Sequence, residues 1–274
     1  DSEAGLLPWS EYWEHYKKGT WRDVIASKCG VPAVAGLFDT KFPCSAMRIP
    51  DQIRAEAFLE RLEKWEKAGE APNLTIVTMT SDHTMGKSPG APTPRAMVAD
   101  NDLALGRMVE GISRSKFWAK SLVLVVEDDA QDGIDHVSGN RTVMLAAGPH
   151  VRRKGLESNF HTHLSLVRTI QEVFGIPPKT RFLAEARPMR SLFTAKPDLT
   201  PYRHVPSKLK LDEMNPPLQA LRGRERWAAS ESAKMNWDEV DDIPSEVLNR
   251  ILWWEAKGYG ASYPEFTKSS RKSR

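Results

Sequence analysis

The sequence lacks any long hydrophobic run, and neither sign of charge dominates it. No stretch of about 18 apolar residues occurs in the chain, so no segment is expected to span a bilayer. The pattern of a signal peptide does not appear at its beginning either. Lys and Arg number 39 against 36 Asp and Glu, a net charge of +3. Because the two signs are mixed along most of the chain, we expect no nucleic-acid partner.

Only two cysteines occur, Cys29 and Cys44. Neither has another Cys or a His at metal-ligand spacing, which argues against a cysteine metal site. A loop of this length is one that a disulfide closes in an oxidising compartment. Two buried free thiols fit the same spacing, so the sequence leaves both alternatives open.

Several nucleotide-binding and catalytic motifs are also missing. The segment 85–94 contains Gly-Lys-Ser, but it lacks the first glycine of a P-loop and is interrupted by prolines, so ATP binding is not expected. There is no G-x-S-x-G elbow and no dinucleotide-binding glycine pattern. With 40% hydrophobic and 27% charged residues, the composition is that of an ordinary globular protein and indicates no activity.

The order of hydrophobic patterns predicts the fold class. Short apolar runs at 74–79, 122–126 and 142–147 alternate with helical patterns at 51–68, 94–113 and 159–174. This alternation is typical of an α/β fold, a mostly parallel sheet with helices on both faces. We expect residues 1–50 to be irregular with one short helix, 51–180 to form the α/β core, and 181–274 to be a Pro-rich extension that wraps the core. The extension should hold helices near 218–233 and 245–256 and end in a basic tail.

Polar side chains follow the expected strands, at the edge where ligands bind in open parallel sheets. Asp82 and His83 follow the first run, and Asp128 and Asp129 follow the second. Consecutive carboxylates at a strand end can approach one hard cation, although solvated turn residues that cap a helix show the same pattern. A single His at a strand end is as often a structural residue as a ligand. Further groups of suitable chemistry follow at Asp135, His136, His161 and His163.

Three stretches carry a resemblance to a known family. They are "NLTIVTMTSDHTMGKSPGAPTPRAMVADNDLALGRMVEGISRSKFW", "LVLVVEDDAQDGIDHVSGNRT" and "FHTHLSLVRTIQEVFGIPP". Their order resembles the bacterial phosphoesterase family of acid phosphatases and phospholipases C, which belongs to the alkaline phosphatase superfamily. The resemblance covers roughly residues 50 to 260 and lies in the order of the motifs. It implies an alkaline phosphatase-like fold and a periplasmic or extracellular location.

The resemblance also implies a chemistry and assigns roles to residues. Asp128 and Asp129 would bind a divalent metal ion. Oxygen ligands alone favour Ca²⁺, Mg²⁺ or Mn²⁺, whereas histidines in the ligand set would shift the preference toward Zn²⁺. The implied reaction is hydrolysis of a phosphate ester through a Ser or Thr phosphoenzyme. His83, His136 and His163 would be catalytic. Asp82, Asp135 and His161 would contact the substrate.

The sequence departs from the family pattern at its amino-terminal end. Family members carry an acidic-Asn metal motif and the Ser or Thr nucleophile before the matched region, and neither motif occurs in residues 1–50. Ser81, Thr84 and Thr20 could replace the nucleophile by residue type alone. We therefore expect the nucleophile, and a partner segment of the same protein, upstream of this chain. The alternative is a catalytically incomplete module that keeps the fold and part of a metal or phosphate site.

Overall fold

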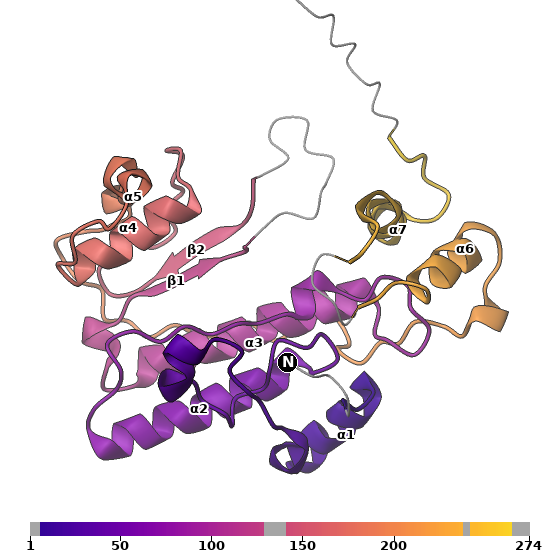
Figure 1. The fold of residues 1–274 in the computed structure, drawn as a ribbon, viewed down its shortest axis with the longest axis horizontal. Helices are drawn as coiled ribbons and strands as arrows, with labels where there is room; N and C mark the ends of the chain where they lie inside the picture. Colours follow the sequence, from indigo (N-terminus) through magenta and orange to yellow (C-terminus); the bar gives the residue numbers. More distant parts are fainter. Residues whose placement is uncertain (1–5, 129–140, 238–241, 265–274) are drawn as a thin grey trace, which may run out of the picture.

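A computed structural model describes residues 6–128, 141–237 and 242–264 (Figure 1). It contains seven α-helices, six 3-10 helices and two strands within these ranges. In chain order they are α1 (Trp9–Lys18), η1 (Trp21–Val24), η2 (Pro32–Leu37), α2 (Asp51–Ala68), η3 (Ser81–His83), α3 (Pro94–Arg114), η4 (Trp118–Lys120), β1 (Val123–Val126), β2 (Met144–Ala147), α4 (His163–Val173), α5 (Arg181–Glu185), η5 (Arg190–Leu192), η6 (Leu218–Ala220), α6 (Gly223–Ser232) and α7 (Ser245–Lys257).

The predicted α/β fold with a mostly parallel sheet is wrong. Helix makes up 45% of the described residues and strand only 5%. β1 and β2 form a two-stranded antiparallel sheet in which Val123 pairs with Ala147 and Val126 pairs with Met144. An apolar run specifies extended, buried chain but does not specify its neighbour or their relative direction. Alternating apolar runs therefore do not determine that strands pair in parallel.

The segment 74–79 is not a strand, although its composition predicted one. It pairs with no other segment in the described part of the chain. Val77 and Met79 pack against the apolar cluster of α2 and α3, whereas Ile76 before them is 84% exposed and Thr78 between them is exposed. The alternation of side chains typical of a strand is thus present, but the hydrogen-bonded neighbour is missing.

The main core lies between α2 and α3, which run side by side (Figure 1). Phe58 and Leu62 of α2 pack with Ala104 and Met108 of α3. The helices approach closely at Gly111, where an added Cβ would lie 2.4 Å from Leu59 Cδ2. Both helices were predicted from the sequence, and Gly69 ends α2 in the left-handed conformation expected of a C-terminal glycine.

The amino-terminal segment packs on the first turns of α2. Tyr12 of α1 and Trp21 of η1 form one apolar cluster with Ile49 and Ile53. Cys29 and Cys44 are separate free thiols, and the Cys29 thiol donates to the Val31 carbonyl oxygen. One short helix was expected in this segment, and α1 is that helix.

The orientation of α4 differs from the expectation. It begins at His163, four residues after the predicted start, where the Thr162 side chain and Ser165 form a capping box. Its apolar residues Leu164 and Val167 were expected to be buried, but both are exposed. Ser165 and Thr169 are buried instead. Thr169 Oγ1 accepts the backbone N–H of Met189 and donates to the Ser165 carbonyl oxygen, so polar contacts hold this helix in place.

Residues of the carboxyl-terminal region fix the loop between η3 and α3 through hydrogen bonds and an ion pair. The amide nitrogen of Asn215 donates to the carbonyl oxygens of Gly86, Ser88 and Pro92, each at 3.1 Å. Lys87 Nζ forms a buried ion pair with Glu255 of α7 at 2.7 Å. The helix predicted at 218–233 is divided into η6 and α6, and α7 matches its prediction within a residue. In the described ranges, no helix is both long and apolar enough to cross a membrane.

Candidate functional site

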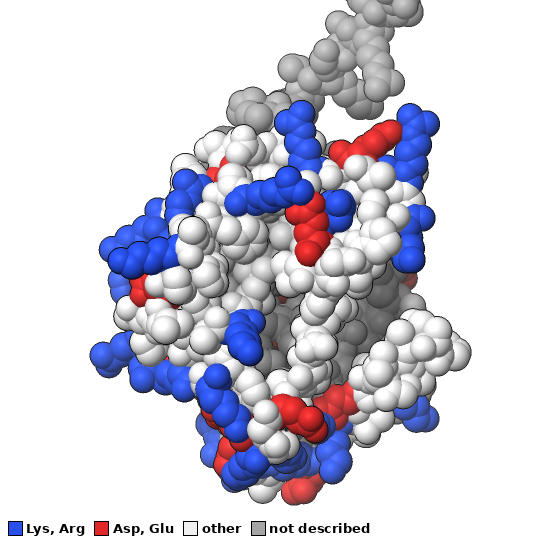
Figure 2. Space-filling view, turned by 90° about the vertical axis from the view of Figure 1, so that its left-hand side faces the viewer, with Lys and Arg blue, Asp and Glu red and all other residues white. Residues whose placement is uncertain are grey.

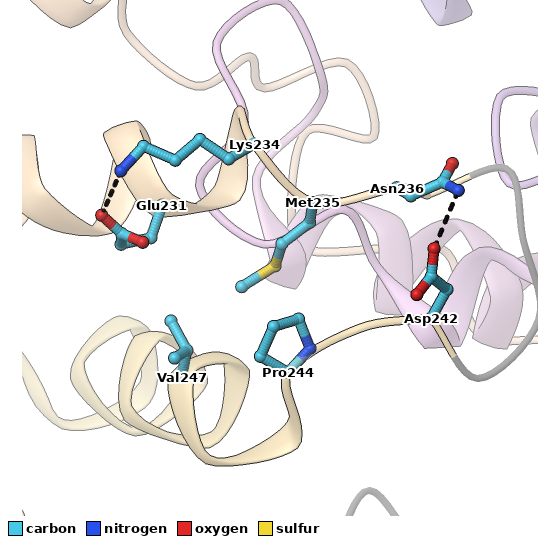
Figure 3. A pocket seen from close by; sticks show the side chains of 7 residues that line it. All are labelled: Glu231, Lys234, Met235, Asn236, Asp242, Pro244 and Val247. Atoms are coloured by element: carbon cyan, nitrogen blue, oxygen red, sulfur yellow. Dashed lines mark hydrogen bonds and ion pairs between the residues drawn. The ribbon is translucent and has the colours of Figure 1, made fainter.

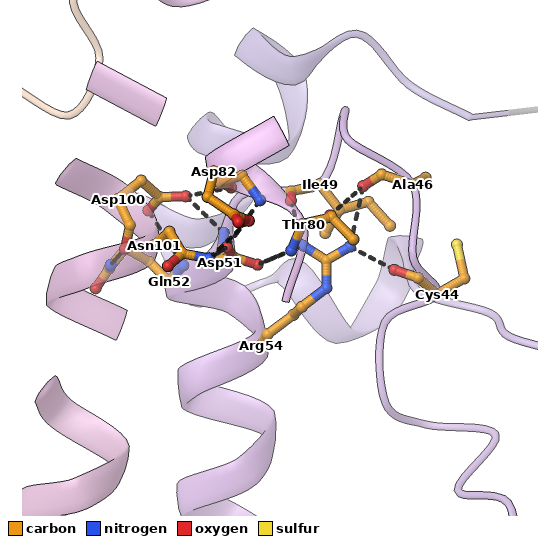
Figure 4. A network of polar contacts seen from close by, with 11 residues as sticks. Cys44, Ala46, Ile49, Asp51, Gln52, Arg54, Thr80, Asp82, Asp100 and Asn101 are labelled. Atoms are coloured by element: carbon orange, nitrogen blue, oxygen red, sulfur yellow. Dashed lines mark hydrogen bonds and ion pairs between the residues drawn. The ribbon is translucent and has the colours of Figure 1, made fainter. Parts of the chain in front are cut away.

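A buried polar network lies where the amino-terminal end of α2 meets η3 and α3 (Figure 4). Pro50 occupies the N-cap of α2 and provides no side-chain acceptor. Asp100 of α3 supplies one, because its carboxylate accepts the backbone N–H groups of Asp51 at 2.6 Å and Gln52 at 3.2 Å. It also accepts the Ser81 hydroxyl at 2.9 Å. One side chain of α3 thus caps α2 and holds η3.

Burial and then the neighbouring charge of Asp51 raise the pKa of Asp100 to about 6. The hydrogen bonds from Ser81 and the α2 backbone act in the opposite direction. Loss of water around a carboxylate disfavours its charged form, and a second carboxylate nearby adds repulsion. Asp100 therefore changes charge in the weakly acidic range, although it is completely buried.

Arg54 compensates the other carboxylate of the network. Its guanidinium, which has no exposed surface, donates to Asp51 Oδ1 at 2.7 Å and to the Ile49 and Ala46 carbonyl oxygens at 2.7 and 2.9 Å. It also donates to the Cys44 carbonyl oxygen. The charge of Arg54 favours a position on the exposed face of α2, yet its side chain is buried. Its hydrogen-bonding role was missed, because nothing in the local sequence indicates the loop carbonyls that surround it.

Asp82 links this network to the surface. Its Oδ1 accepts the amide of Asn101 at 3.1 Å, and the same amide donates to Asp51 at 3.0 Å. Burial is the main cause that raises the pKa of Asp82, and the negative charges of Asp51 and Glu127 add to it. The effect of Glu127 shows that the end of β1 and the end of η3 lie within electrostatic reach of each other.

The backbone beside Asp82 and His83 is strained. Thr84 has φ 62° and ψ 175°, a conformation that β-branched residues rarely adopt. Its Oγ1 accepts the N–H of Gly86, and its side chain is buried. Strain of this kind persists only where the surrounding structure imposes it, and it concentrates at functional sites.

Three predicted site segments converge on this region. The His163 ring nitrogen Nε2 donates to the Glu127 carbonyl oxygen at 3.0 Å, which brings the start of α4 to the end of β1. Because a carbonyl oxygen only accepts, Nε2 carries the proton of this hydrogen bond. Asp128 follows Glu127 and is exposed, as are His83 and His163. Segments about 36 to 80 residues apart in the sequence thus present titratable groups to one region.

Other predicted residues lie elsewhere or outside the described ranges. Asp129, Asp135 and His136 are not among the described residues. Both ring nitrogens of His161 are buried without a hydrogen-bond partner in the described part of the chain. Ser81 and Thr84 are buried, and the Thr20 hydroxyl hydrogen-bonds His15 at the end of α1. Neither of the two hydroxyls near the cluster is open to a substrate.

The donor types near Asp128 fit a divalent cation, since carboxylate oxygens and imidazole nitrogens are its usual ligands. Among the described residues, however, no three His, Cys, Asp or Glu groups are placed together so that they could hold a metal ion. The oxygens of Asp51 are already engaged by Arg54, Ser81 and Asn101. A metal ligand set would therefore have to include Asp128 and residues beyond those described.

A surface pocket lies away from this cluster, between the end of α6 and the start of α7 (Figure 3). It has a volume of about 250 Å³ and is lined by Glu231, Lys234, Met235, Asn236, Asp242, Pro244 and Val247. Its polar groups are paired with one another, Lys234 with Glu231 at 2.7 Å and Asn236 with Asp242 at 3.0 Å. It contains none of the predicted site residues, so we do not assign the site to it.

Comparisons with known proteins add no assignment. The chain matches no family model, no curated protein and no solved structure.

Proposed function

We propose that this chain contributes the metal-binding and proton-transferring part of a phosphate-ester hydrolase. The observation that supports the proposal is the convergence of Asp82 and His83, Glu127 and Asp128, and His163 from three separate segments. Clustered carboxylates repel one another, and a cation or a phosphoryl-bound metal would offset that repulsion. The strained backbone at Thr84, directly after His83, is a second feature that favours a functional site.

In this proposal each residue has a definite role. Asp128, together with Asp129, would hold a divalent metal ion, which when bound neutralises phosphoryl charge and favours the deprotonated nucleophile. His83 and His163 expose imidazoles, the side chains that most often serve as general acids and bases, and His136 would assist them. Asp82 and Asp135 would orient the substrate, whereas the ring nitrogens of His161 are buried and have no role in this proposal. The nucleophile is a Ser or Thr whose position is not assigned.

The second candidate is a catalytically incomplete module with a partial metal or phosphate site. The burial of Ser81 and Thr84 favours it, because a nucleophilic hydroxyl must reach the substrate. Ser81 donates to Asp100 at 2.9 Å, an arrangement similar to a nucleophile and its base. With both groups fully buried, that pair serves the structure.

The first test measures hydrolysis of an aryl phosphate by the purified protein, including any segment upstream of this chain, before and after a chelator, together with its metal content. We expect chelator-sensitive turnover that returns when a divalent metal is added. His163→Ala should lower the rate by about a hundred-fold, the usual effect of removing a general acid or base. His150→Ala is the matched control, since His150 is also exposed and also hydrogen-bonds a backbone carbonyl at 3.0 Å, and its rate should stay near that of the unmodified chain.

The outcomes separate the two candidates. Metal binding that is lost in Asp128→Asn, without turnover, would support the incomplete module and contradict catalysis by this chain. Equal rates for His163→Ala and His150→Ala would remove His163 from the site. Absence of both metal and turnover would contradict the two proposals together.

A further inference from the structure

Helix α4 exposes the side that a packed helix buries. Leu164 and Val167 are exposed, whereas Ser165 and Thr169 of the opposite side are buried. An amphipathic helix normally turns its apolar stripe toward the core. Because polar contacts already fix α4, its apolar stripe is available to a partner.

Three larger apolar side chains protrude from the lobe that contains α4, which consists of residues 141–200. Leu156 is 88% exposed, Phe160 is 85% exposed and Phe182 of α5 is 73% exposed. Leu156 follows a turn at Arg153 and Lys154, in which Lys154 has φ 55°. A single exposed apolar residue needs no explanation. Several large ones around an outward-facing apolar helix indicate an interaction surface.

This lobe, residues 141–200, is also strongly basic. It contains ten Lys and Arg but only four Asp and Glu, although the whole chain has a net charge of only +3. The acidic residues are already engaged: Glu172 pairs with Arg168 and Arg190, and Glu185 with Arg181. Figure 2, which views this side of the molecule, shows Lys and Arg side chains around uncharged surface over much of the face.

We infer that this basic apolar lobe binds the surface of an anionic lipid bilayer. Exposed Phe and Leu among Lys and Arg are the combination by which a protein inserts apolar groups at the headgroup boundary while its cations contact acidic lipids. A second copy of the chain fits less well, because two such lobes would bring like charges together. Nucleic acid is the competing partner, because Phe160 and Phe182 could stack on bases. The exposed aliphatic side chains Leu156, Leu164 and Val167 have no stacking role, and this favours the bilayer. The inference does not depend on the proposed hydrolase function.

The experiment is co-sedimentation of the complete chain with vesicles. Vesicles of equal parts phosphatidylcholine and phosphatidylglycerol should bind the chain, vesicles of phosphatidylcholine alone should bind it far less, and added salt should weaken the binding. Phe160→Ser and Phe182→Ser should each reduce affinity by about ten-fold. Ile76→Ser, at an equally exposed position outside the lobe, is the control and should bind as the unmodified chain does.

Charge reversal tests the contribution of the basic residues independently. Lys179→Glu with Arg187→Glu should weaken binding by about twenty-five-fold or more, at about five-fold for each basic charge. Lys18→Glu with Lys64→Glu makes the same change on exposed positions of α1 and α2 and separates a lobe-specific effect from total charge. All these positions are exposed, so the variants should fold, and circular dichroism confirms it.

Several outcomes would overturn the inference. Equal binding to both vesicle types, or equal losses in the two charge-reversal pairs, would contradict binding of this lobe to anionic lipid. Retention of a DNA duplex under conditions where vesicles are not bound would favour nucleic acid, and a concentration-dependent dimer that Phe160→Ser abolishes would favour a second copy of the chain. Neutralising the tail residues Lys268, Arg271, Lys272 and Arg274 to Gln tests the remaining basic cluster. Binding that is lost with the tail and kept in the lobe variants would also contradict it.

Discussion

Arg54→Ala is expected to lower the free energy of unfolding by about 3 to 5 kcal/mol, the range found when one partner of a buried ion pair is removed. The substitution leaves the Asp51 carboxylate buried without its cation. It also removes the donors to the carbonyl oxygens of Cys44, Ala46 and Ile49. The loop before α2 would then lose its attachment to the helix. Urea denaturation followed by tryptophan fluorescence measures the change.

Arg61→Ala is the matched control for this prediction. Arg61 lies on the same helix and pairs with Asp39, but both side chains are about one-third exposed, so its loss should change stability by less than about 1 kcal/mol. Arg54→Lys, which keeps a positive charge and loses the planar fork, gives a second point if the alanine variant does not fold. A loss below about 1 kcal/mol at Arg54 would show that the network tolerates an uncompensated Asp51.

Asp100 should make the protein less stable as the pH rises from about 4 to 6. Its pKa is raised from the ordinary value of 3.8 to about 6, so in that window the folded chain holds a proton that the unfolded chain has released. Stability from this group is therefore complete below pH 4 and is lost by about pH 6. A shift of two pKa units corresponds to about 3 kcal/mol. Denaturation at a series of pH values measures the slope.

Asp100→Asn should flatten the pH dependence over the same window, because a side chain without a titrating proton cannot contribute to it. The variant also turns a donor toward one of the capped amides, so part of the cap is lost at all pH values. Asp102→Asn, the same change at an exposed position of α3, controls for the substitution. An unchanged slope in Asp100→Asn would contradict the shifted pKa.

The helices were predictable from the sequence because their signals are local. Pro50 and Gly69 delimit α2, and Thr93 with Pro94 begins α3. The sheet was not predictable, since strand pairing depends on which distant segment supplies the partner. The same reason explains the segment 74–79, which has the composition of a strand but no partner in the described residues. Which side of α4 is buried also depends on tertiary context. The hydrogen bonds of Thr169 fix the polar side of the helix inward, against the expectation from its apolar periodicity.

The candidate site was predictable in part. The clusters at Asp82, Asp128 and His163 were visible as polar groups after apolar runs, and the structure brings their segments together. The Asp51 and Asp100 network was not visible, because two acids 49 residues apart on separate helices have no common motif. The basic lobe could have been detected from the sequence. Its charge is diluted in the total of +3, and only a count over residues 141–200 separates it.

The triple hydrogen bond from Asn215 has a consequence for the order in which the molecule assembles. Its partners Gly86, Ser88 and Pro92 precede it by more than 120 residues, and the same loop is tied to Ser232 and Glu255. During synthesis, α2 and α3 can pair as soon as both have emerged, since their contacts are comparatively local. The loop that leads out of His83 must wait for the last quarter of the chain. The scaffold of the candidate site is thus completed late, by contacts between segments more than 120 residues apart.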